Sequence, residues 1–123
     1  MSNEPFDAEQ NAVLTKSYKF AVRMLKLYEH LRLTRHEYIV SRQAVRSGTS
    51  IGANVEEAVG AISKAEFSAK LSIAYKEARE TSYWLRLLHD GEYLETKLFE
   101  SLHTDCQELC KILFTILRST GRA

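Results

Sequence analysis

The sequence predicts an all-α protein, folded as an antiparallel up-down-up-down four-helix bundle. Apolar residues recur at alternating spacings of three and four residues along most of the chain, which is the period of amphipathic helices. No segment shows a strand pattern, and only short segments separate the periodic ones. Short connections place consecutive helices side by side in opposite directions. At 123 residues, the chain is expected to form one domain, residues 1–123, with a modest core of its own.

The first predicted helix covers about residues 8–33 and carries two apolar rows. One row keeps the four-three spacing of a bundle seam: Val13, Ser17, Phe20, Met24, Leu27 and Leu31. The second row lies beside it: Leu14, Tyr18, Ala21, Leu25 and Tyr28. This second row either widens the core-facing surface of the helix or is covered by another subunit. The pattern alone allows both, and the candidate interface residues are Leu14, Tyr18, Leu25 and Tyr28.

The second predicted helix covers about residues 35–61, because Thr34-Arg35-His36-Glu37 has the form of a capping box. Its apolar face is small at the start and comprises Ala44, Gly48, Ile51, Val55, Ala58 and Ile62. Gly48 and Gly52 each cost a helix about 1 kcal/mol relative to alanine. Either the helix breaks near residues 47–50 or a neighbouring element approaches closely, and we favour a continuous, kinked helix with close packing.

The third predicted helix, about residues 64–89, begins at a second capping box, Ser63-Lys64-Ala65-Glu66. There the Ser63 hydroxyl would accept from the Glu66 amide, and the Glu66 carboxylate would accept from the Ser63 amide. Asp90-Gly91 would end the helix, with Gly91 in the left-handed conformation. The predicted core row is Phe67, Leu71, Ala74, Ala78, Thr81, Leu85 and Leu88.

The fourth predicted helix, about residues 96–119, again carries two apolar rows. One row is Leu98, Leu102, Leu109, Ile112 and Ile116. The other is Phe99, Cys106, Cys110, Leu113 and Leu117.

The stretch from Ser50 to Leu88 resembles the 23S rRNA intervening-sequence proteins, also called the S23 ribosomal protein family. The family's middle helix reads roughly S-I-P-A-N-I-A-E-G, and the residues that match it here are Ser50, Ile51, Ala53, Asn54 and Glu57. The departures are Gly52 in place of Pro, Glu56 in place of Ala and Ala58 in place of Gly. The run from Ser63 to Ala74 resembles the family's S-K-K-E-F-x-R-F-L-x-I-A, and the run from Lys76 to Leu85 resembles K-E-A-x-E-T-x-Y-W-L. The resemblance implies a four-helix bundle that assembles as a homopentamer, and it implies no established activity.

The charge of the chain is nearly balanced, at +1 from 17 Lys plus Arg and 16 Asp plus Glu. This balance argues against a dedicated nucleic-acid binder, since such domains usually have a pI above about 9. Residues 16–46, however, carry eight basic and two acidic side chains, a local charge of +6. The candidate residues for binding an RNA or DNA backbone are Lys16, Lys19, Arg23, Lys26, Arg35, Arg42 and Arg46. A basic row is more often a solvated face, but in a ring it would repeat as a belt that binds backbone without sequence preference.

A second polar group is predicted to be structural and comprises Asn54, Glu57, Glu77 and Glu80. We expect an ion-pair network with arginines such as Arg42, Arg46 and Arg79 that fixes the register of the helices. A carboxylate di-iron site would need Glu-x-x-His on two helices, and these glutamates have no such histidine.

Metal, cofactor and enzyme chemistry find little support in the sequence. His103, Cys106 and Cys110 share a helix face, but no fourth ligand is evident, so the cysteines are predicted to be small buried residues. The four histidines have no paired nucleophile in a known motif, and there is no glycine-rich phosphate loop. We therefore expect no metal site, no cofactor, no small-molecule substrate and no enzymatic activity.

The expected cellular context is the cytoplasm. No apolar run approaches the roughly 18 residues of a membrane span, and the acidic, polar N-terminus is unlike a signal peptide. The sequence thus predicts a non-enzymatic homo-oligomeric bundle that binds RNA or DNA backbone. The alternative is a protein-interaction or scaffold module with no nucleic-acid role.

Overall fold

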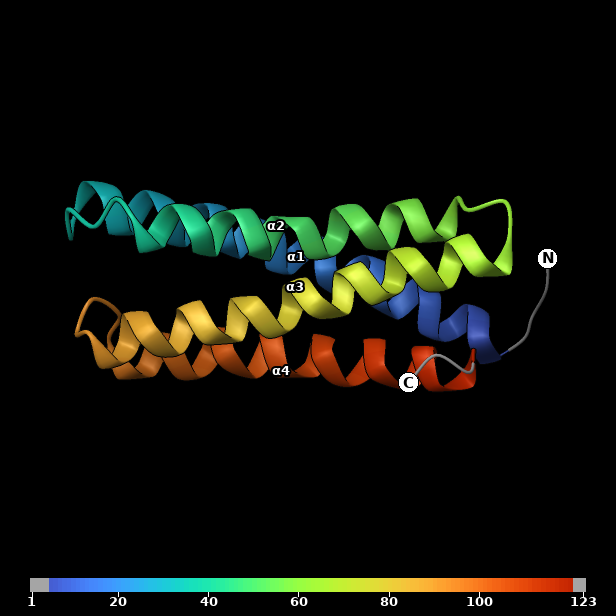
Figure 1. The fold of residues 1–123 in the computed structure, drawn as a ribbon. Helices are drawn as coiled ribbons and strands as arrows, with labels where there is room; N and C mark the ends of the chain where they lie inside the picture. The colour runs from blue at the N-terminus through green and yellow to red at the C-terminus, as the bar shows by residue number, and fades with distance from the viewer. Residues whose placement is uncertain (1–4, 121–123) are drawn as a thin grey trace.

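The computed structural model describes the backbone of residues 5–120 and the side chains of residues 11–120. Its four helices are α1 (Pro5–Leu33), α2 (Val40–Val59), α3 (Lys64–Asp90) and α4 (Thr96–Ser119). No strand occurs within residues 5–120, so the all-α fold is confirmed. Figure 1 shows successive connections at alternate ends of the molecule, so consecutive helices run in opposite directions.

Each helix packs against two others: α1 and α3 each lie against both α2 and α4. Contacts between α1 and α4 illustrate the antiparallel alignment. Lys16 meets Glu108, and Arg23, further along α1, meets Asp105, earlier on α4. The pair of α1 and α4 and the pair of α2 and α3 have no helix in common, so the two pairs form opposite sides of the bundle.

The core contains the whole predicted seam of α1, since Val13, Ser17, Phe20, Met24, Leu27 and Leu31 are all buried. The second row of α1 behaves differently: Tyr18 is 68% exposed and Leu25 55% exposed. The explanation that this row widens the core-facing surface is therefore wrong for Tyr18 and Leu25. On α4, by contrast, both predicted rows enter the core, through Leu102, Leu109 and Ile116 and through Cys106, Leu113 and Leu117.

Helix α2 begins at Val40, five residues after the start near residue 35 that the capping box predicted. Glu37 caps the helix instead. Its buried carboxylate accepts hydrogen bonds from the amides of Ile39, Val40 and Ser41 at 3.2, 3.0 and 2.6 Å. Residues 34–39 form the turn, in which His36 has a φ of 56°. The carboxylate satisfies amides that follow it in the chain, so the helix starts after Glu37 rather than before it.

The glycines of α2 lie inside a continuous helix, so the break considered near residues 47–50 does not occur. Each allows the close packing against α1 that the sequence favoured. A Cβ atom on Gly48 would stand 2.6 Å from Met24 Cγ, and one on Gly52 would stand 3.3 Å from the Ser17 carbonyl oxygen. Helix α2 ends at Val59, and Ile62, which was expected to extend the buried face, is 95% exposed in the turn that follows.

The termini of α3 follow the prediction in part. The Ser63 hydroxyl accepts from the Glu66 amide at 3.1 Å, as expected, but the Glu66 carboxylate accepts from the Ile62 amide rather than from that of Ser63. Gly91 has a φ of −81°, so the prediction of a left-handed Gly91 is wrong. Glu92 takes that conformation instead, with a φ of 68°.

Candidate functional site

The basic residues of α1 lie along the edge that faces α4. The Lys16 ammonium pairs with Glu108 at 3.0 Å. The Arg23 guanidinium pairs with Asp105 at 2.7 Å and also donates to the Ser101 hydroxyl and carbonyl oxygens. Across residues 11–120, no acidic partner is found for Lys19 or Lys26. Half of this row is thus neutralised within the bundle.

The other three predicted backbone-binding residues lie elsewhere. The Arg35 guanidinium donates to the carbonyl oxygens of Glu92 and Tyr93 at 2.8 and 2.9 Å, and so ties the α1–α2 turn to the α3–α4 turn. Arg46 faces α3, on the side of the bundle opposite the α1–α4 edge. Arg42 is exposed on α2. The seven basic residues therefore occupy three separate places rather than a single face.

The predicted ion-pair network forms between α2 and α3 with Arg46 at its centre. Arg46 lies 2.7 Å from Glu80 and 3.4 Å from Glu77, and the Trp84 indole donates to Glu80 at 3.1 Å. The hydrogen bond that Arg46 donates to Glu80, and the weaker one that it donates to Glu77, raise the pKa of Arg46 and so favour its charged form against the effect of burial. Because the Arg46 side chain is half exposed, the pairs contribute register more than stability, about 0.2–1 kcal/mol each.

The other residues predicted to be structural lie outside this network. The Asn54 side-chain amide donates to the Ser50 carbonyl and hydroxyl oxygens within α2. Glu57 pairs with Lys70 of α3 at 2.7 Å. Glu57, Glu77 and Glu80 thus each take part in an ion pair between α2 and α3. Arg79, expected as a partner for these carboxylates, lines the groove between α3 and α4.

The exposed row of α1 forms one wall of an apolar groove. Leu14, Tyr18 and Ala21 face Thr49, Gly52 and Ala53 of α2, with Glu56 and Glu57 at the margin. Leu25 and Tyr28, the remaining candidate interface residues, continue the row along α1 beyond the groove. This surface departs from the polar exterior expected of an isolated bundle.

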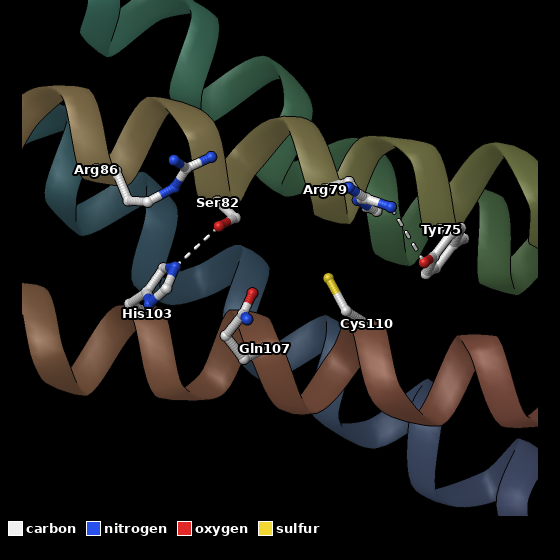
Figure 2. Close-up of a pocket in the computed structure, with 7 residues that line it drawn as sticks. All are labelled: Tyr75, Arg79, Ser82, Arg86, His103, Gln107 and Cys110. Carbon is white, nitrogen blue, oxygen red and sulfur yellow. Dashed lines mark hydrogen bonds between the residues drawn. The ribbon is translucent and has the colours of Figure 1, made fainter.

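A second, polar groove of about 440 Å³ lies between α3 and α4. Figure 2 shows one wall formed by residues of α3 and the other by residues of α4. The seven lining residues are Tyr75, Arg79, Ser82, Arg86, His103, Gln107 and Cys110. Ser82 Oγ and His103 Nε2 share a hydrogen bond of 2.8 Å across the groove. No carboxylate lines it.

The pKa values of two groups in this groove, His103 and Cys110, are lowered, in each case partly by an arginine. Burial and the nearby Arg86 guanidinium lower the pKa of His103. The Cys106 thiol, and more weakly Arg79, lower the pKa of the Cys110 thiol, although burial acts in the opposite direction. Cys106 is itself fully buried, donates to the Ala78 carbonyl, and has a raised pKa because of Cys110 and burial. Cys110 is thus the more reactive of the two thiols.

The arrangement in Figure 2 does not complete a nucleophilic site within the described chain. Ser82 and His103 have the distance of a nucleophile and its base, but no carboxylate contacts the other nitrogen of His103 to orient it. His103 stacks on Phe99 instead, with ring centroids 5.0 Å apart. No group of three or more potential metal ligands is found where side chains are described.

This groove was not predicted from the sequence, although its pattern is present there. Tyr75, Arg79, Ser82 and Arg86 follow one another at spacings of four, three and four residues. His103, Gln107 and Cys110 do the same on α4. Each set shares a helix face, but a polar row at helical spacing has the appearance of an ordinary solvated face until the facing helix is known.

The fold and these surfaces define the class of protein as an antiparallel four-helix bundle with an exposed apolar row and a polar groove. No helix in residues 5–120 is long and apolar enough to cross a membrane. A family model described as 23S rRNA-intervening sequence protein matches residues 9–115. The chain belongs to this family.

Similarity to solved structures extends over most of the chain, as one example shows. It is the crystal structure of a protein of unknown function from the S23 ribosomal protein family of Bacteroides thetaiotaomicron VPI-5482. The two chains are 47% identical, with a TM-score of 0.88 over 89% of this chain and 98% of the other. No curated protein matches the sequence.

Proposed function

We propose that this protein is a non-enzymatic, cytoplasmic scaffold that assembles as a homo-oligomer, a pentamer by the family resemblance, through the apolar groove between α1 and α2. The observation that carries the proposal is the exposed row on α1, in which Tyr18 and Leu25 are more than half exposed. Burying a side chain of this size stabilises an interface by about 1.5–3 kcal/mol. The row continues along the helix, so one partner surface can cover all of it.

Assembly should be lost when charges enter this row. In the double variant Tyr18→Glu with Leu25→Glu, the mass measured by light scattering should fall to that of one chain, while the circular dichroism spectrum remains helical. Both residues lie outside the buried core, so the bundle itself should persist. The matched control is Ile73→Glu with Leu87→Glu, which alters two exposed apolar residues of α3 and should leave the mass unchanged. An unchanged mass in the Tyr18 and Leu25 variant would contradict the proposed interface.

A second candidate function is binding of RNA or DNA backbone, with no catalytic step. It is favoured by Lys19 and Lys26, which lie on one side of α1 without acidic partners in the described part of the chain. Repetition of this pair around an oligomer would form a ring of positive charge that attracts phosphates.

Salt dependence tests this second candidate. Fluorescence anisotropy would measure binding to a short structured RNA and to the matching DNA. The logarithm of the association constant should fall linearly with the logarithm of the salt concentration. In Lys19→Glu with Lys26→Glu the slope should become shallower by about 2, because each lysine accounts for about one released counterion. The control Lys64→Glu with Lys97→Glu makes the same change of charge at the starts of α3 and α4, and it should retain binding. Absence of binding at low salt by the intact oligomer would leave the scaffold function alone.

A further inference from the structure

We propose that the groove between α3 and α4 is a binding site for a small ligand that carries phosphate groups, held by Arg79 and Arg86. The site lies within one subunit, between two helices of the same chain. It is separate from the α1–α2 groove and from the lysines of α1, so it does not depend on the functions proposed above.

The argument starts from the contrast between the arginines of this groove and those elsewhere in the bundle. Arg23 and Arg46 pair with carboxylates at 2.7 Å, and Arg35 donates to two carbonyl oxygens. Arg79 and Arg86 have no acidic partner where side chains are described, and both stack against tyrosines. Arg79 also donates one hydrogen bond to the Tyr75 hydroxyl at 3.5 Å. A guanidinium has five N–H donors, so both arginines retain donors at the edge of a groove in which no described carboxylate takes part.

The remaining groups in the groove suit an oxyanion with several acceptor atoms. Ser82, Gln107 and His103 line the groove with the two arginines. Gln107 can donate to a ligand, and so can one member of the hydrogen-bonded Ser82–His103 pair. Arginine and phosphate form bidentate, charge-assisted pairs. Arg79 and Arg86 are seven residues apart, which is about 10 Å along a helix. Their long side chains can converge from that spacing, and two guanidinium groups suit the charge and the several oxygens of a diphosphate better than those of a single carboxylate.

The electrostatic state of the groove supports the same ligand. Burial and then Arg86 lower the pKa of His103, and the Cys106 thiol and then Arg79 lower the pKa of Cys110, so each arginine adds positive charge to the groove. An anion between the arginines would offset that charge. Since the lining side chains leave about 440 Å³, the space is suited to a small molecule rather than to a duplex.

Cys110 provides a reporter for occupancy, because it lines the groove while Cys106 is buried. The rate of alkylation of Cys110 by iodoacetamide, resolved from Cys106 by fragment mass spectrometry, would be measured against pyrophosphate concentration at constant ionic strength. At ten times the dissociation constant, the rate should fall about tenfold, because only about one site in eleven remains free. Calorimetric titration with pyrophosphate provides a direct measure of binding.

The variant Arg79→Gln with Arg86→Gln should lose this protection. Each loss of a charge-assisted contact is expected to weaken pyrophosphate binding about tenfold. The matched control is Arg118→Gln, which removes an arginine that stacks on Phe114 of α4 but does not line the groove. Protection is compared as the ratio of rates with and without pyrophosphate, since the loss of Arg79 alone raises the pKa of Cys110 and slows alkylation.

Three results would overturn the proposal. The first is no protection or heat of binding with pyrophosphate. The second is equal protection in the double variant and in Arg118→Gln. The third is protection by a short RNA but not by pyrophosphate, which would assign the arginines to a nucleic-acid backbone. The dissociated variant Tyr18→Glu with Leu25→Glu should still bind pyrophosphate, so failure of this site and failure of the proposed assembly are distinguishable.

Discussion

Replacing Glu37 with alanine should lower the free energy of unfolding by about 2 kcal/mol, among the largest effects of a single side chain outside the apolar core. The Glu37 carboxylate accepts hydrogen bonds from three successive amides at the start of α2. Without it, those amides lose their acceptor in a turn that is partly closed to water. Urea unfolding followed by circular dichroism measures the change.

The control for this prediction is Thr34→Ala. Thr34 begins the capping box that the sequence suggested, but in the structure α2 starts six residues later. Its replacement should change stability by less than about 0.5 kcal/mol, as at an ordinary surface position. A larger loss for Thr34→Ala than for Glu37→Ala would show that Thr34, and not Glu37, caps the helix.

A single methyl group at Gly48 should destabilise the bundle although alanine is the better helix former. Alanine contributes about 1 kcal/mol of helix propensity relative to glycine. Overpacking a closed core costs about 1–3 kcal/mol. The new Cβ atom would lie 2.6 Å from Cγ of Met24, whose side chain is fully buried. We expect a net loss on the order of 1–2 kcal/mol in the free energy of unfolding for Gly48→Ala.

Two comparisons isolate the contact with Met24. Gly60→Ala at the end of α2 meets no atom closer than 3.8 Å, so it should be neutral or stabilising by up to about 1 kcal/mol. In a Met24→Ala background, Gly48→Ala should cost much less, because Cγ and Cε are removed and only the Cβ of residue 24 remains, at 3.2 Å. A cost that persists in full in that background would place the strain somewhere other than at Met24.

The helices of this protein could be predicted to different extents because their ends are specified differently. Helix α4 matches its predicted bounds, and α3 begins at Lys64 as expected because Ser63 and Glu66 are local cap residues. Helix α2 was predicted to begin too early. The sequence allowed Glu37 to serve either in a capping box that starts at Thr34 or as the acceptor for amides that follow it. In the structure Glu37 accepts from the following amides, in a turn that Arg35 ties to the α3–α4 turn.

The functional surfaces were less predictable than the helices. The basic row of residues 16–46 was read as one candidate face, but Lys16 and Arg23 meet acids of α4, and Arg46 meets acids of α3. Those partners lie 31 to 92 positions away in the chain. A local count of charges cannot include them, and it likewise gives no weight to Arg79 and Arg86, which lie in a nearly neutral stretch.

By itself, the sequence determined the all-α class, the number of helices, the seam of α1 and the family, because helical period and short motifs are properties of contiguous residues. The tertiary structure alone decided that Tyr18 and Leu25 remain exposed and that Lys16, Arg23 and Arg46 are already paired with acids. It also placed Arg79 and Arg86 in one groove with His103. The physical reason is that burial and charge pairing depend on which helix faces which. That arrangement is set by the packing of the whole bundle.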